Sequence, residues 1–222
     1  MVYAEIAEYK PLSRDLRGTW SSGSQQVLTG ADRNDNVRFH SSSKANNQMF
    51  YNPYRKQFTV PRSAGISYSF LPSNGSDNEG FFEEARFQYQ SDSQNPHCFS
   101  AQLIWLHGRY KYGRNNLATD MTLSAYPGDS MIQTITNPEC TGGKSVETDV
   151  YTLDKNQEYI KNFTTFIEND APYPQPGSNT KAMWGLQMYQ FDGAPLAKMY
   201  LKYDPPQMLP TEQMFVQVIG VN

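Results

Sequence analysis

The stretch that most restricts the fold of this chain lies at residues 184–212 and reads WGLQMYQFDGAPLAKMYLKYDPPQMLPTE. Its Asp192-Gly193 pair predicts a tight turn, because glycine tolerates a positive φ and aspartate can bond its own backbone. After the turn, residues 198–203 alternate with the period of a half-buried strand. Pro205-Pro206 should end that strand, because proline has no N–H for the ladder. The stretch therefore predicts a β-hairpin followed by a proline-rich segment.

Runs of aromatic and β-branched residues recur along the rest of the chain, with turn signals between them. The expected strands are 16–22, 66–71, 81–90, 101–112, 117–124, 131–136 and 149–153. Residues 157–167 fit either a helix or a strand. Short strands at this spacing favour an all-β fold, and the serial hairpins favour a single antiparallel up-and-down β-barrel with little helix. The Gly18-x-Trp20 pattern is shared with lipocalin-like, or calycin-like, barrels.

The 222 residues suit one domain. We expect a flexible lead at 1–15, the β-barrel domain at 16–212 with a long polar insertion at 31–64, and a C-terminal tail at 213–222. No apolar run is long enough to span a membrane, and the N-terminus is too polar for a signal peptide.

Most enzyme and nucleic-acid signatures are absent from the sequence. The Gly142–Ser145 segment ends like a phosphate-binding loop, but Pro138 stands where that loop needs glycine. No Gly-x-Ser-x-Gly elbow or Cys-x-x-Cys pair occurs, and His40, His97 and His107 lack the spacing of a metal site. The net charge is −3 and no basic block occurs, which argues against nucleic acid as a partner. We therefore expect no catalytic residue, no cofactor and no metal.

Glu83 is the most suggestive carboxylate. Strand alternation places it on the same face as Phe81, Phe87 and Tyr89, and Glu84 on the opposite face. A buried carboxylate needs a partner. Glu83 could anchor a ligand or act as a catalytic acid, or it could fix the strand register through a structural hydrogen bond or ion pair; the structural role is favoured.

The aromatic and methionine residues allow two interpretations. They could form a surface that stacks on a sugar, a lipid or an unfolded chain, or they could fill a barrel core, and the core is favoured. The residues expected to contact a ligand or a client, if such a surface exists, are Trp20, Glu83, Trp105, His107, Tyr189 and Met208.

The two cysteines, Cys98 and Cys140, leave the compartment open when taken alone. Asn74 and Asn162 each begin an N-glycosylation sequon. Together these features favour an oxidising, secretory location with a Cys98–Cys140 disulfide over two free buried thiols.

Six segments resemble, in order, a known family: GTWSSGSQQVLTG at 18–30, GISYSF at 65–70, FFEEARFQ at 81–88, NPHC at 95–98, IWLHGRY at 104–110 and LQMYQFDGAPLAKMYLKYDPPQMLP at 186–210. The chain is similar to the fungal ER-membrane chaperones named for reversal of target-of-rapamycin lethality. That family is linked to cell-wall β-1,6-glucan assembly and glycoprotein folding. The polar insertion is longer than the family's, and residues 125–180 match poorly.

The resemblance implies a luminal domain of the endoplasmic reticulum (ER) that carries the Cys98–Cys140 disulfide and has no catalytic residues. It also implies a membrane anchor that this chain does not carry. The leading hypothesis is a non-enzymatic chaperone or assembly factor for secretory glycoproteins. The alternatives are a calycin-type carrier of a lipid or small apolar ligand, a structural subunit of a larger assembly and, last, a glycan-active enzyme. The expected partners are unfolded or maturing secretory proteins or a protein complex, with a lipid or a glycan as a possible ligand.

Overall fold

The computed structural model describes residues 15–23, 25–30, 49–74, 78–92, 94–95, 97–113, 120–137, 140, 142, 145–150, 157–172 and 182–215. The elements of these residues are strands: β1 (Gly18–Ser22), β2 (Tyr51–Asn52), β3 (Gln57–Phe58), β4 (Gly65–Pro72), β5 (Glu79–Ser91), β6 (Phe99–Tyr112), β7 (Met121–Thr136), β8 (Val146–Val150), β9 (Gln157–Glu168), β10 (Met183–Gln190) and β11 (Met199–Tyr203). The prediction of an all-β fold is confirmed.

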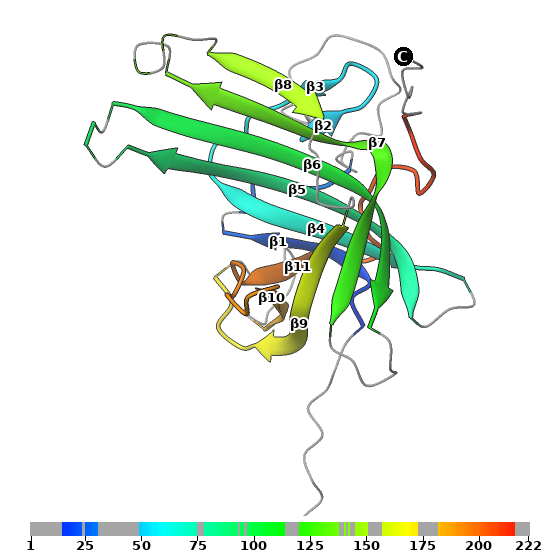
Figure 1. Ribbon diagram of the computed structural model, residues 1–222. Coiled ribbons are helices and arrows are strands. Elements are labelled where there is room, and N and C mark those ends of the chain that lie inside the picture. Colours follow the sequence, from blue (N-terminus) through cyan, green and yellow to red (C-terminus); the bar gives the residue numbers. More distant parts are fainter. Residues whose placement is uncertain are drawn as a thin grey trace, which may run out of the picture.

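Nine of these strands form one antiparallel sheet in the order β6-β5-β4-β1-β11-β10-β9-β7-β8 (Figure 1), and β2 pairs with β3 in a separate hairpin. β6 also pairs with β7. The pairings therefore form a cycle in chain order: β1, β4, β5, β6, β7, β9, β10 and β11 each pair with the next, and β11 pairs with β1.

Most of the predicted strands are present, and the differences have simple causes. β10 and β11 form the expected hairpin, with Gly193 at a φ of 91° and the Ala194 N–H bonded to Asp192 Oδ1 at 2.9 Å. The ambiguous segment 157–167 is strand β9, because β7 and β10 pair with it on its two sides. The predicted polar insertion contains the short β2–β3 hairpin, while residues 31–48 and the lead up to residue 14 lie outside the described residues.

The side chains on one face of the sheet form an apolar cluster to which every strand of the cycle contributes. We call it the inner cluster; its buried members are Leu16, Trp20, Ile66, Tyr68, Phe70, Phe82, Ile104, Leu106, Tyr110, Met121, Leu123, Ile160, Leu186, Met188, Met199 and Leu201. Most of these large side chains have no solvent-accessible surface, so no water-sized void lies against them. The inner face is therefore packed by its own side chains.

The opposite face of β5 and β6 carries a second apolar cluster. This outer cluster consists of Val27, Phe50, Tyr51, Phe58, Ala85, Phe87, Ala101, Leu103, Trp105 and Leu209. The β2–β3 hairpin covers it, with the Tyr51 ring stacked on Trp105 at a centroid distance of 4.6 Å. Glu83 and Glu84 lie on opposite faces of β5, as the alternation predicted. Ala85 and Phe87, on the face of Glu83, belong to the outer cluster, and Phe82, on the face of Glu84, belongs to the inner cluster.

Four strands extend beyond the cycle as a sheet, shown at the upper left of Figure 1. We call this sheet the wing; it consists of residues 87–91 of β5, 99–103 of β6, 131–136 of β7, and β8. At its tip, a Cys98–Cys140 disulfide joins the β5–β6 connection to the β7–β8 connection, with the two Cα atoms 5.6 Å apart. The expected disulfide is therefore present.

Glu84 is buried on the inner face beside two half-buried charged side chains, Arg86 and Glu158. Arg86 Nη2 lies 2.6 Å from Glu84 Oε1 and 3.3 Å from Glu158 Oε1, and it donates to the Tyr68 hydroxyl at 3.2 Å. One guanidinium thus faces two carboxylates. Burial raises the pKa of Glu84 to about 8; the Arg86 charge lowers it, and the Glu158 charge raises it further.

A Glu84→Gln variant should lose much of the pH dependence of stability. Because the pKa of Glu84 is higher in the folded chain, folding takes up a proton, and stability falls as pH rises from about 4.5 to about 8. We expect this fall to shrink by roughly 2–5 kcal/mol in the variant, measured by urea unfolding at several pH values. Glu147→Gln, at an exposed carboxylate of β8, is the control and should keep the wild-type slope. Identical slopes in wild type and Glu84→Gln would contradict the prediction.

Candidate functional site

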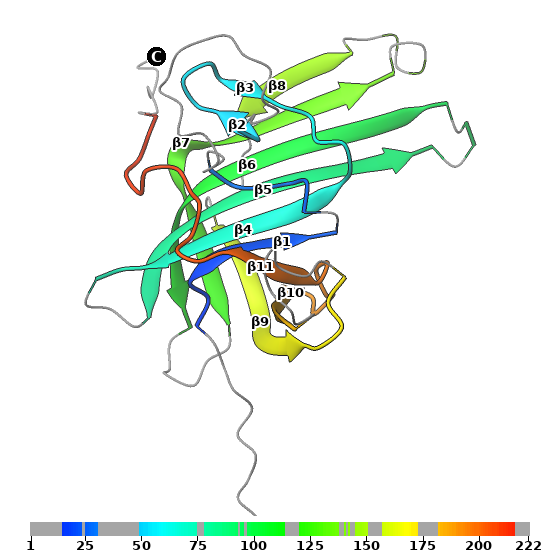
Figure 2. The same ribbon diagram turned by 180° about the vertical axis from the view of Figure 1, so that it is seen from behind.

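A segment without regular secondary structure crosses the outer side of the sheet after β11. We call residues 204–215 the strap. Figure 2 shows it in orange to red, running from the end of β11 across the sheet toward β7. Its buried residues include Leu209 and Gln207, at 6% and 4% exposure. Since buried backbone groups must be hydrogen-bonded, the strap needs partners that the sheet ladder cannot provide.

Polar side chains in one lateral row of the sheet supply these partners. Thr19 of β1 pairs with Ser69 of β4, Ser69 with Glu83 of β5, and Glu83 with His107 of β6. Because laterally paired residues share a face, all four side chains point toward the strap. All four are buried. We call them the polar row.

Glu83 is the central residue of the polar row. Its Oε2 accepts the backbone N–H of Leu209 in the strap at 2.6 Å. Its Oε1 accepts the backbone N–H of Gly30 at 2.9 Å and the indole N–H of Trp105 at 3.1 Å. Burial raises the pKa of Glu83, while the bonds from Leu209 and Gly30 favour its charged form. The carboxylate thus holds two backbone segments against β5.

Asp129 of β7 holds the far end of the strap in the same way. Its Oδ2 accepts the N–H of Met214 at 2.7 Å, and its Oδ1 accepts the N–H of Phe215 at 2.8 Å. His107 Nδ1 lies 3.1 Å from Oδ2, and because a carboxylate can only accept, Nδ1 carries the proton in this contact. Asp129 therefore links the end of the strap to the polar row.

The carbonyl oxygen of Gln207 in the strap accepts three hydroxyl groups. They come from Ser69 at 2.6 Å, Thr29 at 3.0 Å and Thr19 at 3.2 Å, and the Gln207 N–H donates to Thr19 Oγ1 at 2.7 Å. Gly30 follows Thr29 with a φ of +67°, and a Cβ there would lie 2.7 Å from Met208 N. Only glycine combines that φ with that approach to the strap without strain.

The residues expected to contact a ligand or client fall into three places. Glu83, Trp105, His107 and Met208 gather beneath or within the strap; the first three are buried and Met208 is half-buried. Trp20 is fully buried in the inner cluster, where its indole N–H donates to the Leu16 carbonyl at 2.8 Å. Tyr189 is half-buried on β10. Glu83 therefore has the structural hydrogen-bonding role that the sequence favoured.

Sequence reasoning missed Thr19, Ser69 and Asp129. Strand alternation can assign a face to each of them, but it does not reveal which residues of neighbouring strands lie side by side. The mixture of hydroxyl and carboxylate groups at positions that face an apolar cluster was the signal that could have found them.

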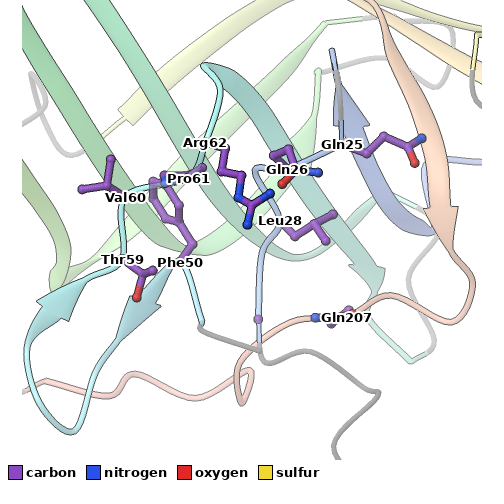
Figure 3. A pocket seen from close by; sticks show the side chains of 10 residues that line it. Gln25, Gln26, Leu28, Phe50, Thr59, Val60, Pro61, Arg62 and Gln207 are labelled. Carbon is purple, nitrogen blue, oxygen red and sulfur yellow. The ribbon is translucent and has the colours of Figure 1, made fainter. Parts of the chain in front are cut away.

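A hollow of about 430 Å³ opens beside the strap (Figure 3). Its lining comes from the 25–30 segment, the residues around β3, and the strap: Gln25, Gln26, Leu28, Gly30, Phe50, Thr59, Val60, Pro61, Arg62 and Gln207. Among the described residues, the lining is mostly amide, hydroxyl and apolar, and Arg62 is its one charged group. These described groups offer hydrogen bonds to a peptide or a polar ligand.

Exposed apolar side chains gather on the outer face of the wing. Tyr89, Phe99, Val146 and Val150 are 63%, 45%, 49% and 49% exposed, and they make up four of the nine large apolar side chains that are exposed among the described residues. Tyr89 and Val146 lie in one lateral row with Ala101 and Ile135. We call Tyr89, Phe99, Ile135, Val146 and Val150 the apolar tip. Four of its members continue the outer cluster away from the β2–β3 hairpin, whereas Val150 lies in the lateral row of Met131 and Trp105. The apolar tip is the candidate functional site.

The two sequon asparagines lie away from the apolar tip. Asn74 is exposed in the β4–β5 connection. Asn162 is half-buried on β9, opposite Tyr189 of β10. Neither position is adjacent in sequence or in register to the wing strands.

Within the described residues, no group of three or more His, Cys, Asp or Glu side chains is arranged to hold a metal ion. No helix of the described part of the chain is long and apolar enough to cross a membrane.

Comparison with known proteins gives a consistent result. Residues 16–218 match the family model Rot1, described as a fungal chaperone for protein folding within the ER. The chain is 36% identical to Protein ROT1 of Candida glabrata over 90% of its own length and 60% of that relative's length. It is 32% identical to Protein rot1 of Schizosaccharomyces pombe, over 98% of this chain and 75% of that relative. It is also 32% identical to Protein ROT1 of Saccharomyces cerevisiae, over 96% of this chain and 67% of that relative. No solved structure matches.

Replacing Glu83 by Gln should loosen the strap. The amide group keeps the size of the side chain but puts an NH₂ where a carboxylate oxygen accepts a backbone N–H. We expect a loss of about 2 kcal/mol in the free energy of unfolding and faster hydrogen exchange of the Leu209 and Gly30 amides. Urea unfolding and NMR-detected exchange measure the two effects.

Glu79→Gln on the same strand is the matched control. Glu79 is partly exposed and its Oε1 lies 3.4 Å from Arg109 Nη2, so its loss should change stability by no more than about 0.5 kcal/mol. Unchanged exchange at Leu209 in Glu83→Gln, or equal effects of the two variants, would show that Glu83 does not hold the strap.

Proposed function

Because this chain belongs to the Rot1 family of fungal chaperones for protein folding within the ER, we propose that it is a non-enzymatic chaperone or assembly factor for secretory glycoproteins. The chain spans about 60% of the length of the first relatives it matches, so the activity of the whole protein is part of the proposal. The observation that carries the proposal is the apolar tip. Unfolded clients expose apolar side chains, and the exposed apolar side chains on one face of the wing offer them a place to bind.

The use of the buried acidic groups supports a non-enzymatic role. Asp129 accepts two backbone N–H groups of the strap, one on each oxygen. Glu83 accepts one backbone N–H from the strap, that of Leu209, and one from Gly30. Glu84 is enclosed in the inner face beside Arg86. A catalytic acid or base must reach its substrate, and these carboxylates are committed to the fold instead.

We also propose that the cycle of strands is an up-and-down barrel of the lipocalin or calycin type. The support is the order of the pairings, which follows the chain and returns from β11 to β1. The dense packing of the inner cluster argues against the alternative of a carrier with an internal ligand cavity. N-glycosylation of Asn74 and Asn162 belongs to the same proposal, since ER proteins meet the glycosylation machinery.

The test of the proposed function is suppression of the aggregation of an unfolding model protein without ATP. The wild-type chain should suppress it. The double variant Tyr89→Thr/Phe99→Thr should require about tenfold more protein for the same effect, because two apolar contacts with the client are removed. Threonine keeps the preference for strand, so the fold should persist. Light scattering and circular dichroism follow the two properties.

The matched control is Ile167→Thr/Phe191→Thr. Ile167 is 45% exposed and lies on β9, and Phe191 is 72% exposed and directly follows β10, so both lie outside the wing. This variant should suppress aggregation as the wild type does. The proposed function fails if the wild-type chain does not suppress aggregation at all. Equal losses in both double variants would mean that the apolar tip is not the client-binding surface.

A further inference from the structure

Strand β8 is the edge of the wing. It pairs with β7 through Val146–Val150, and among the described residues no strand pairs with its other side. All five of its residues are exposed. Figures 1 and 2 both show β8 at the border of the sheet. Such an edge is a template for one more strand.

The ladder to β7 determines which backbone groups of β8 face outward. Thr136 N donates to Ser145 O at 2.9 Å, so this pair is hydrogen-bonded. Because hydrogen-bonded pairs alternate along antiparallel strands, Glu147 and Asp149 also bond to β7, while Val146, Thr148 and Val150 direct their N–H and C=O groups away from it. The Val150 N–H is bonded locally, to Asp149 Oδ1 at 2.7 Å. The Val146 and Thr148 groups are therefore available at the edge.

The side chains of β8 divide into two chemical kinds. Val146 and Val150 lie on the outer face with the apolar tip, on either side of Thr148. Glu147 and Asp149 lie on the other face, and no ion pair joins either carboxylate to a residue that the structure describes. The edge thus combines an apolar side with an uncompensated negative side.

We propose that β8 binds an extended segment of a client by antiparallel strand addition, and that the preferred segment alternates apolar and basic residues. This inference rests on the proposed function and names the class of segment that the apolar tip takes. Apolar residues of the bound segment lie opposite Val146 and Val150, and its lysine or arginine residues lie opposite Glu147 and Asp149. Antiparallel addition continues the direction of every pairing in the sheet.

The charges also select against other occupants. A second copy of β8 added antiparallel about Thr148 would place Glu147 opposite Asp149, and like charges directly opposite each other are destabilising. A neutral apolar strand would leave both carboxylates uncompensated beside it. The acidic residues therefore prevent self-association through this edge while favouring a basic partner.

Short capped peptides test the direct contact. A peptide of alternating valine and lysine should bind the full chain at least about tenfold more tightly than one of alternating valine and glutamate, because two cross-strand charge pairs change sign. N-methylation of the valines should abolish binding, since their N–H groups face β8; N-methylation of the lysines should preserve it, since theirs face away. Equal binding of the lysine and glutamate peptides, or the reverse N-methylation pattern, would overturn the proposal.

Two variants at one position test the edge on the protein side. Thr148→Ala and Thr148→Pro both remove the hydroxyl that accepts from Gln133 Nε2 at 2.9 Å, but only proline also removes the outward N–H. Binding should persist in Thr148→Ala and be lost in Thr148→Pro, with circular dichroism showing that both fold. Glu147→Lys/Asp149→Lys should reverse the peptide preference. Loss of binding in both Thr148 variants, or in neither, would contradict strand addition.

Aggregation suppression measured on the same samples separates this inference from the proposed function. A wild-type chain that suppresses aggregation but binds neither peptide would overturn strand addition at β8 and leave the chaperone proposal intact.

Discussion

The rest of the outer side of this molecule depends on one constraint: the backbone of the strap is buried, and the sheet beneath it has no ladder groups to spare. The polar row meets that constraint with side chains. Two hydroxyls, a carboxylate and an imidazole from four neighbouring strands stand side by side, and Asp129 extends them to β7. The Glu83 carboxylate accepts hydrogen bonds from Gly30, Leu209 and Trp105 together. The positions of the 25–30 segment, the strap and β6 therefore depend on one another cooperatively.

The adjacent residues Glu83 and Glu84 show how the two faces of β5 are divided. Both are buried acids, yet one is compensated by backbone donors and the other by a guanidinium. The first kind of compensation fixes where a segment of chain lies. The second leaves a carboxyl group whose pKa is raised by burial, so it contributes pH dependence rather than position.

Sequence patterns were sufficient for most strands, the Asp192-Gly193 hairpin and the face that each residue of β5 occupies, because these depend on local alternation and turn chemistry. They divided β7 into two strands, at 117–124 and 131–136, and they left 157–167 open between helix and strand. The cysteines and the two sequons already favoured the Cys98–Cys140 disulfide, and the resemblance to a known family strengthened that expectation and supplied the chaperone hypothesis. Patterns could not supply the lateral register that places Thr19 beside Ser69, since register is settled between strands distant in sequence. The strap was also out of reach, because a segment without periodicity gives no sign of the surface it covers.

The disulfide at the tip of the wing has a mechanical consequence. A chain that binds along an edge strand and then moves would pull on that strand, and a ladder loaded from its end opens one hydrogen bond at a time. Cys140 lies in the connection between β7 and β8, and its bond to Cys98 ties this connection to the one between β5 and β6. A force on β8 is therefore transmitted through covalent bonds to the connection between β5 and β6, and the four strands of the wing resist separation together.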